Sequence, residues 1–174
     1  MSSHQERLVE KYRAKGILID ANLALLYLVG GYDLRLVGDG KYKKLSKYNE
    51  EDYRLLLRLK NVFKKAVTTP HVLTEVSNLT NDLPEKTKSA CLKKFYETFV
   101  EIHELPISSM DAAQRADFHF LGLTDSGLAI VSDRYLIVTD DARLIQKMTE
   151  SRLEALNFSH LRGHLLTDSE YIRS

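Results

Sequence analysis

The chain has 174 residues, of which 44% are hydrophobic, enough for one globular domain, spanning 1–174, with a continuous core. The 25 Lys and Arg residues nearly balance the 24 Asp and Glu residues, so the formal net charge of +1 excludes a uniformly basic nucleic-acid coat protein. The single cysteine, Cys91, excludes an intramolecular disulfide and a thiolate zinc cluster, and it suits a reducing, cytoplasmic compartment.

No segment predicts export or membrane insertion. Residues 1–16 are charged and amphipathic and lack the apolar centre of a secretory signal. The longest apolar stretch, 23–29, is about a third of the roughly 20 residues that cross a bilayer. We therefore expect a protein without a membrane span.

The first third of the chain predicts a β–α unit and a basic insertion. The apolar run 17–19 predicts a buried strand that ends at Asp20, and the spacing that follows predicts a helix with a glycine stop at Gly30 and Gly31. Residues 32–48 are rich in glycine and lysine and predict an exposed insertion. A short helix at 5–15 precedes this unit, and a helix at about 50–65 follows it.

The rest of the chain predicts helices that alternate with short apolar segments. The expected elements are a β-like segment at 66–69, a helix capped by Thr69 with Pro70 in its first turn, a helix from Pro84, a strand at 105–107, helices at about 110–120 and from an N-cap at Thr124 to about 133, a strand at 135–139, a helix at about 142–148 and a last strand at 164–166. Strands separated by helices indicate an α/β fold with a parallel sheet covered on both faces.

Acidic residues follow two of the predicted strands. Asp20 and the pair Asp140 and Asp141 come directly after apolar runs, so in a parallel sheet they would emerge at the same edge, where α/β proteins form their sites. The alternative is that each aspartate only caps the next helix. The sequence alone leaves both interpretations open.

Two further carboxylates are predicted on helices. Glu75 lies on the flank of a stripe formed by Val72, Val76 and Leu79, where an acid is costly unless it is paired, bound to a cation or able to reach water. Asp125 would lie in the first turn of the helix after Thr124, where the helix dipole alone also favours it.

The order of these motifs resembles that of the PIN domain, a nuclease fold in which a strand-end Asp, a helical Glu, a helical Asp and a late Thr-x-Asp meet at the edge of the sheet. The matching segments are 17–22 (ILIDAN), 69–76 (TPHVLTEV), 123–129 (LTDSGLA) and 136–141 (LIVTDD). The resemblance covers nearly the whole chain except the insertion and the termini. It implies a PIN-like three-layer sandwich with a central parallel sheet of four to five strands flanked by helices.

The resemblance also implies the site residues. By position, the carboxylates that would bind metal and support catalysis are Asp20, Glu75, Asp125 and Asp141, while Asp140 occupies the variable place, so either of the last pair could bind metal directly. Asn22 and Thr139 match residues that orient the carboxylates. Oxygen ligands favour Mg²⁺ or Mn²⁺ over zinc, and such ions can hydrolyse RNA as in an endoribonuclease.

A basic segment is the predicted contact for the substrate, single-stranded or structured RNA. Tyrosines are interleaved with the candidate RNA-binding residues Lys41, Lys43, Lys44, Lys47, Arg54 and Arg58. Reversing the charge of Lys43, Lys44 and Lys47 should weaken RNA binding and flatten its salt dependence. The alternative is a solvated insertion with a charged helix face.

Other classes fit less well. A haloacid-dehalogenase-like phosphatase needs a second Asp where this chain has Asn22, and a receiver domain has its acidic pair near the first strand. His160 and His164 lack a third zinc ligand. A PIN-like module without activity, which binds RNA or protein, remains the alternative. Within the family, the chain could be the toxin of a toxin–antitoxin pair or a stand-alone nuclease; a toxin would be expected to dimerise and to bind an antitoxin-like inhibitor.

Overall fold

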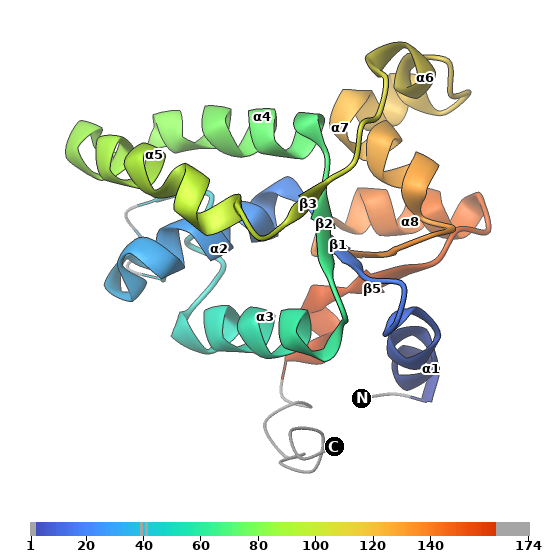
Figure 1. Cartoon of the computed structure of the whole chain (residues 1–174), viewed down its shortest axis with the longest axis horizontal. Helices are drawn as coiled ribbons and strands as arrows, with labels where there is room; N and C mark the ends of the chain where they lie inside the picture. Colours follow the sequence, from blue (N-terminus) through green and yellow to red (C-terminus); the bar gives the residue numbers. More distant parts are fainter. Residues whose placement is uncertain (1–2, 39, 41, 163–174) are drawn as a thin grey trace.

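The protein is an α/β domain in three layers, built on a five-stranded sheet whose order is β3-β2-β1-β4-β5 (Figure 1). The computed structural model describes residues 3–38, 40 and 42–162. The strands are β1 (Ile17–Ile19), β2 (Ala66–Thr68), β3 (His103–Glu104), β4 (Leu136–Thr139) and β5 (Ala155–Asn157). All four strand pairs are parallel. The predicted fold class, with a parallel sheet of four to five strands, is confirmed.

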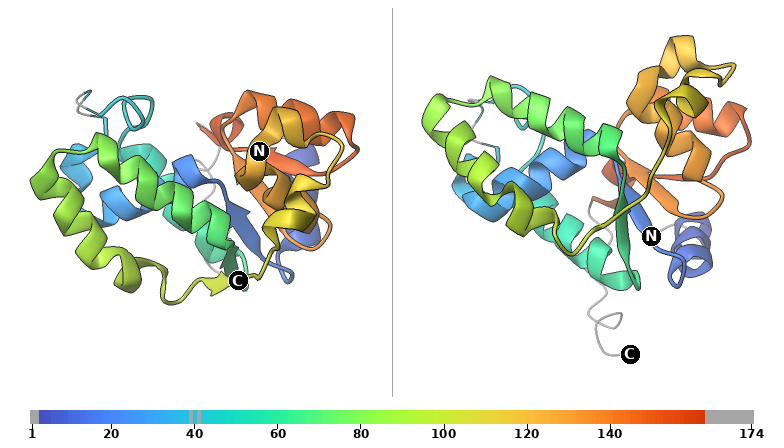
Figure 2. Two further views of the ribbon diagram at one scale, coloured as in Figure 1. Left: turned by 90° about the horizontal axis from the view of Figure 1, so that it is seen from above. Right: turned by 45° about the horizontal axis from the view of Figure 1, so that its top comes forward.

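Helices cover both faces of the sheet. In the part of the chain that the structure describes, the α-helices are α1 (Ser3–Tyr12), α2 (Ala21–Tyr32), α3 (Glu50–Val62), α4 (Pro70–Leu79), α5 (Glu85–Phe99), α6 (Ser109–Ala113), α7 (Phe118–Val131) and α8 (Ala142–Glu150). The 3₁₀ turns are η1 (Leu34–Leu36), η2 (Thr80–Asp82) and η3 (Phe158–Leu161). Helices α2 to α5 form one layer, and α1, α6, α7 and α8 form the other (Figure 2). None of the described helices combines the length and the apolar character needed to cross a membrane.

The chain changes direction across the sheet between β1 and β4. From β1 it builds β2 and β3 on one side, and it then returns to place β4 and β5 on the other side of β1. Ile19 pairs with Val138, and the Asp20 N–H donates to the Val138 carbonyl at 3.0 Å, so the two central strands end side by side. Such a point of reversal leaves a crevice at the carboxyl ends of the strands.

Both central strands are buried because helices cover them on both faces. Residues 136–139 are buried throughout, and Leu18 is fully buried. This explains why each reads as a continuous apolar run rather than an alternating one. Local caps fix the adjoining helices: the Thr69 hydroxyl accepts from the Val72 N–H at 3.2 Å, with Pro70 in the first turn, as predicted.

The helical boundaries around Gly122 differ from the prediction. The predicted break is present, because Gly122 is non-helical, with a φ of 70°, and α7 consists of two helical segments joined at a kink there. A positive φ is accessible to glycine at little cost. No hydrogen bond of the Thr124 side chain caps the second segment among the residues described, and the predicted helix at 110–120 is split between α6 and the start of α7.

The predicted glycine stop of α2 is also wrong by two residues. The helix continues to Tyr32. Gly30 lies against α3, where a Cβ at this position would lie 2.3 Å from Cδ2 of the Tyr53 ring. The glycine therefore permits a close approach between α2 and α3.

The edge strands were predicted poorly. Strand β3 lies at 103–104 rather than 105–107, and β5 at 155–157 falls in a stretch that the sequence did not mark as a strand. The strand predicted at 164–166 lies outside the described residues. Edge strands this short offer too few residues for a recognisable apolar pattern.

Residues 32–48 are not the simple exposed loop that the glycines and lysines predicted. Val37, Tyr42, Leu45 and Tyr48 are buried, Leu45 and Tyr48 being 1% and 2% exposed. Lys43 and Lys44 are exposed, while the apolar side chains around them join the core. The segment is therefore a packed part of the domain and not a peripheral addition.

Candidate metal and active site

Asp20 lies at the centre of the candidate site. The residue is only 4% exposed, its Oδ1 accepts the Leu23 N–H at 2.8 Å, and its Oδ2 accepts a short hydrogen bond from the Thr139 hydroxyl. Burial raises the pKa of Asp20 to about 7; the two hydrogen bonds lower it, the negative charge of Asp140 raises it and Lys47 lowers it. Asp20 thus caps α2 and also contacts Thr139 at the end of β4.

Thr139 links the ends of the two central strands. Its hydroxyl donates to Asp20 and accepts the Asp141 N–H at 2.9 Å. A hydroxyl used in this way fixes the orientation of one carboxylate and the backbone of another. This is the position predicted for an orienting residue. Asn22 is half-buried, and no hydrogen bond of its side chain occurs among the residues described.

Asp141 caps α8 and lines an open hollow. Its Oδ1 accepts from the Arg143 N–H at 2.7 Å and from the Leu144 N–H at 3.3 Å. The hollow, of about 180 Å³, is also lined by Asp125 from α7. These two carboxylates therefore share one solvent-accessible space, although 16 positions separate them in sequence.

Asp125 is where the negative charges converge. It is half-buried on α7, and burial is the main cause that raises its pKa to about 7. The charges of Asp20, Asp141 and Glu75 raise it further, and the positive charge of Arg143 opposes them. Carboxylates from β1, α4 and the β4–α8 junction are thus all close enough to act on Asp125.

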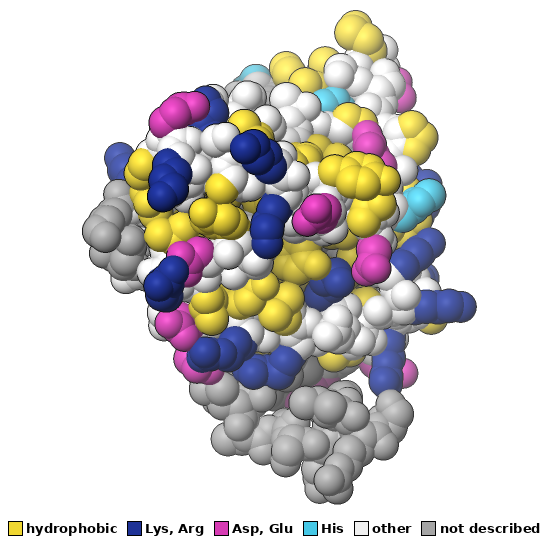
Figure 3. All heavy atoms as spheres, turned by 60° about the vertical axis from the view of Figure 1, so that its left-hand side comes forward, with side chains coloured by type: hydrophobic (Ala, Val, Ile, Leu, Met, Phe, Trp, Pro, Cys, Tyr) yellow, Lys and Arg dark blue, Asp and Glu magenta, His cyan; other side chains and the backbone are white. Residues whose placement is uncertain are grey.

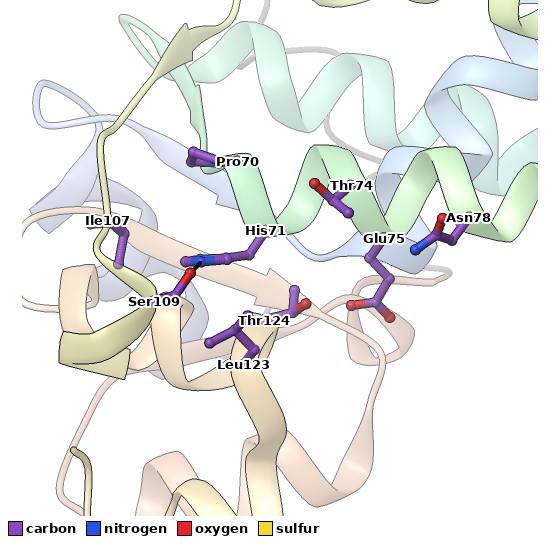
Figure 4. Close-up of a pocket in the computed structure, with 9 residues that line it drawn as sticks. All are labelled: Pro70, His71, Thr74, Glu75, Asn78, Ile107, Ser109, Leu123 and Thr124. Carbon is purple, nitrogen blue, oxygen red and sulfur yellow. Dashed lines mark hydrogen bonds between the residues drawn. The ribbon is translucent and has the colours of Figure 1, made fainter. Parts of the chain in front are cut away.

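Glu75 reaches this region from the other layer. It lies on α4 next to the fully buried Val76, is half-buried, and lines a hollow of about 530 Å³ between α4 and α7. In Figure 4, its side chain extends from α4 toward α7, where Thr124 lies. On the opposite side of the hollow, His71 Nε2 lies 2.9 Å from the Ser109 hydroxyl (Figure 4).

Asp140 is turned away from this hollow and has its own partners. Its side chain is 2% exposed; Oδ2 lies 2.8 Å from Lys47 Nζ and accepts from the Tyr48 hydroxyl at 2.6 Å. Burial and the nearby charges of Asp20 and Asp140 raise the pKa of Tyr48 far above its usual value, so its hydroxyl stays a donor. Asp140 Oδ1 is buried without a hydrogen-bond partner among the described residues.

The predicted substrate-binding residues do not form one free basic surface. Lys43 and Lys44 are exposed, whereas Lys47 pairs with Asp140. Arg54 pairs within its own helix, with Glu50 at 2.9 Å and Glu51 at 2.6 Å. Arg58 is half-buried, and Lys41 lies outside the described residues. Figure 3 shows Lys and Arg side chains of the α2–α5 layer dispersed among acidic and hydrophobic ones.

The carboxylates of the cluster are suitable ligands for a hard cation, but they are spread apart. In the described part of the chain, no group of three His, Cys, Asp or Glu side chains is close enough to hold a metal ion. Mg²⁺ commonly uses only one or two carboxylates and keeps several waters. Asp125 and Asp141, which share a hollow, fit such a pair, while Asp20 and Glu75 would act through water.

Several residues of this site carried no signal in the sequence. Tyr48 and Asp140 are 92 positions apart and meet only because residues 32–48 fold back onto the sheet. Phe120, Arg143 and Lys147 line the hollow beside Asp125 and Asp141, and the sequence gave no reason to select them. The interleaving of tyrosine with lysine at 42–48 was a usable signal, since Tyr42 and Tyr48 are buried and Lys47 pairs with Asp140.

Comparisons with known proteins add no assignment: no protein-family model matches the chain, and no curated protein or solved structure matches it either. The functional argument therefore depends on the geometry of this site.

Proposed function

We propose that the chain is a metal-dependent endoribonuclease of the PIN type. The observation that supports this best is the convergence on Asp125 of the charges of Asp20, Glu75 and Asp141, which come from three different elements at the point where the sheet reverses direction. Concentrating carboxylates in this way raises their pKa values and opposes folding, a cost that a bound divalent cation would offset.

Each side chain has a separate task in this proposal. Asp125 and Asp141 hold Mg²⁺ or Mn²⁺ at the open hollow, and Asp20 and Glu75 orient water around it. The ion would supply the charge that activates water and stabilises the leaving alkoxide. Thr139 keeps Asp20 and the Asp141 backbone in place. Lys47 neutralises Asp140 and so limits the repulsion that Asp20 experiences.

The test is cleavage of labelled RNA, both single-stranded and structured, with Mn²⁺ or Mg²⁺. Wild-type protein should cut, EDTA should stop cleavage, and Asp20→Asn should abolish it while the fold is retained. Asp82→Asn is the matched control, because Asp82 is exposed in η2, away from the cluster. Intact RNA in every metal-containing reaction with wild-type protein would refute the proposal.

The second candidate is a PIN-like module without activity that binds RNA or protein. It is favoured by the absence, among the described side chains, of three ligands positioned around one ion. The two candidates differ in their response to metal. An inactive module should bind RNA without cleaving it, and its melting temperature should not change when Mn²⁺ is added.

Partners stay predictions. If the chain is a toxin, a homodimer and an antitoxin-like inhibitor covering the acidic hollow are expected, whereas a stand-alone nuclease needs neither. Leu92 and Tyr96 on α5, and Val100 directly after it, are exposed apolar residues, with Tyr96 75% exposed. Size-exclusion chromatography with light scattering would measure the oligomeric state.

A further inference from the structure

The hollow that contains Asp125 and Asp141 combines two cations with an exposed aromatic ring. Its lining includes Phe120, Arg143 and Lys147 as well as the two carboxylates. Phe120 is 54% exposed on α7, so part of its ring is accessible at the edge of the hollow. The site proposed above assigns no role to these three side chains.

The aromatic surface is larger than one ring. His119, the preceding residue on α7, is exposed, and its ring centroid lies 4.0 Å from that of Phe120 with an interplanar angle of 43°. Lys147 Nζ lies over the Phe120 ring, 4.5 Å from its centroid, and also pairs with Glu150 at 2.7 Å. The cation–π contact holds Phe120 at the edge of the hollow.

The hollow also contains positively charged side chains. Arg143 is exposed, and its positive charge acts on Asp125, as shown by its opposing effect on the pKa of that carboxyl group. If a divalent ion neutralised Asp125 and Asp141, the guanidinium and the Lys147 ammonium would leave the hollow with a net positive charge. A phosphate could then enter next to the carboxylates.

We infer that this hollow between α7 and α8 binds one unpaired nucleotide of single-stranded RNA next to the cleavage centre. The base stacks on Phe120, beside which His119 lies, and Arg143 and Lys147 bind the phosphate. The inference rests on the proposed function and adds to it both the form of the substrate and the surface that binds it. It replaces the segment 41–58 as the main substrate contact.

The shape of the hollow favours an unpaired nucleotide over a duplex. At about 180 Å³ it can accept a single base, with the phosphate at its edge beside Arg143, but not a helical strand. An exposed ring stacks on any base whose face is free, whereas bases inside a duplex already stack on one another. The larger hollow beside Glu75 contains no lysine or arginine among the residues that line it and therefore lacks the charge needed to bind a phosphate.

The test measures binding in the Asp20→Asn background with Mg²⁺, so that the RNA stays intact, by fluorescence anisotropy of a labelled single-stranded oligoribonucleotide. Phe120→Ala should weaken binding by roughly 5- to 100-fold, the loss of one stacked base, while Phe120→Tyr should retain it. Arg143→Gln with Lys147→Gln should lower the slope of log affinity against log salt. A series of RNAs, each with an abasic residue at a different position, should locate the stacked base. For the RNA that lacks this base, Phe120→Ala should bind as well as the protein with Phe120 intact.

Tyr96→Ala is the matched control, because Tyr96 is an exposed aromatic residue on α5, 75% exposed against 54% for Phe120. Lys43→Glu with Lys44→Glu tests the segment first predicted to bind RNA. The inference is overturned if Phe120→Ala binds RNA no more weakly than Tyr96→Ala, or if only the Lys43 and Lys44 variant loses affinity.

Failure of the subsite can be separated from failure of the proposed function by cleavage kinetics of proteins with Asp20 intact. If wild type cleaves RNA and Phe120→Ala has the same KM, the subsite is refuted and the nuclease stands. A rise in KM with little change in kcat supports the subsite. If wild type neither binds nor cleaves RNA, both proposals fall.

Discussion

Lys47 Nζ lies 2.8 Å from Asp140 Oδ2, so a lysine from the segment 32–48 neutralises one of the carboxylates at the edge of the sheet. The contact explains why this segment is packed: Tyr48, the next residue, is buried and donates to the same carboxylate. The basic segment therefore serves the internal electrostatics of the domain as well as its surface.

We predict that Lys47→Met lowers the free energy of unfolding by about 1–3 kcal/mol, because it leaves a buried carboxylate with only the Tyr48 hydroxyl as partner. Adding Asp140→Asn should recover most of this loss, since the neutral amide needs no counter-charge. Urea denaturation of the four proteins of this double-mutant cycle measures the coupling.

Lys43→Met provides the control, because Lys43 is exposed in the same segment. Its change in unfolding free energy should stay within about 0.5 kcal/mol. Equal losses for Lys43→Met and Lys47→Met would show that the Asp140 contact contributes nothing specific.

Parts of the fold could be predicted where the local signal was complete. The strands at 17–19 and 136–139 are buried on both faces, so their apolar runs were unbroken, and the Thr69 cap required only neighbouring residues. The edge strand at 155–157 has a single fully buried residue, Leu156, and no such run to recognise.

The pH dependence of stability follows from the buried carboxylates. Because Asp20 and Asp125 have pKa values of about 7 in the folded protein, against 3.8 for a free aspartate, the folded state binds more protons between these limits. Stability without metal should therefore fall as the pH rises from about 4 to about 7 and change little above that. Burial is the main cause of the raised pKa of Asp125; the charges of Asp20, Asp141 and Glu75 raise it further, and Arg143 lowers it.

Chemical denaturation in EDTA at pH 5.5 and pH 8 measures the effect. Wild type should lose roughly 2 kcal/mol for each of the two groups over this range. Asp125→Asn should reduce the loss and make the protein more stable than wild type at pH 8. A wild-type protein that is as stable at pH 8 as at pH 5.5 would contradict the raised pKa values.

The candidate site could be predicted only in part, for a similar reason. The acidic residues were found because strand ends and helical faces can be counted along the sequence. The partners of Asp140 could not be found, because Lys47 reaches it only through the packing of Tyr48 and Leu45. The break at Gly122 was marked by the glycine, whereas nothing in the sequence indicated that Phe120 would be exposed beside the hollow.

The Thr139 hydroxyl is expected to affect both stability and metal affinity. Thr139→Val keeps the shape of the side chain but removes the donor to Asp20 and the acceptor for the Asp141 N–H. We expect a loss of about 1–3 kcal/mol in unfolding free energy and a 10- to 100-fold weaker affinity for Mn²⁺ by titration calorimetry. Thr139→Ser keeps the hydroxyl and should bind the ion nearly as well as wild type; equal losses in both variants would point to packing alone.

Metal binding should distinguish Asp141 from Asp140, the two neighbours that the sequence could not separate. Mg²⁺ or Mn²⁺ should raise the melting temperature at pH 8, because a ligand that binds only the folded state stabilises it. Asp141→Asn and Asp125→Asn should each remove most of this increase, since both carboxylates line the open hollow. Asp140→Asn should retain it, because Asp140 is held by Lys47 and Tyr48. Differential scanning fluorimetry with and without the ion measures all three variants, and a thermal shift that depended on Asp140 rather than Asp141 would reverse the assignment.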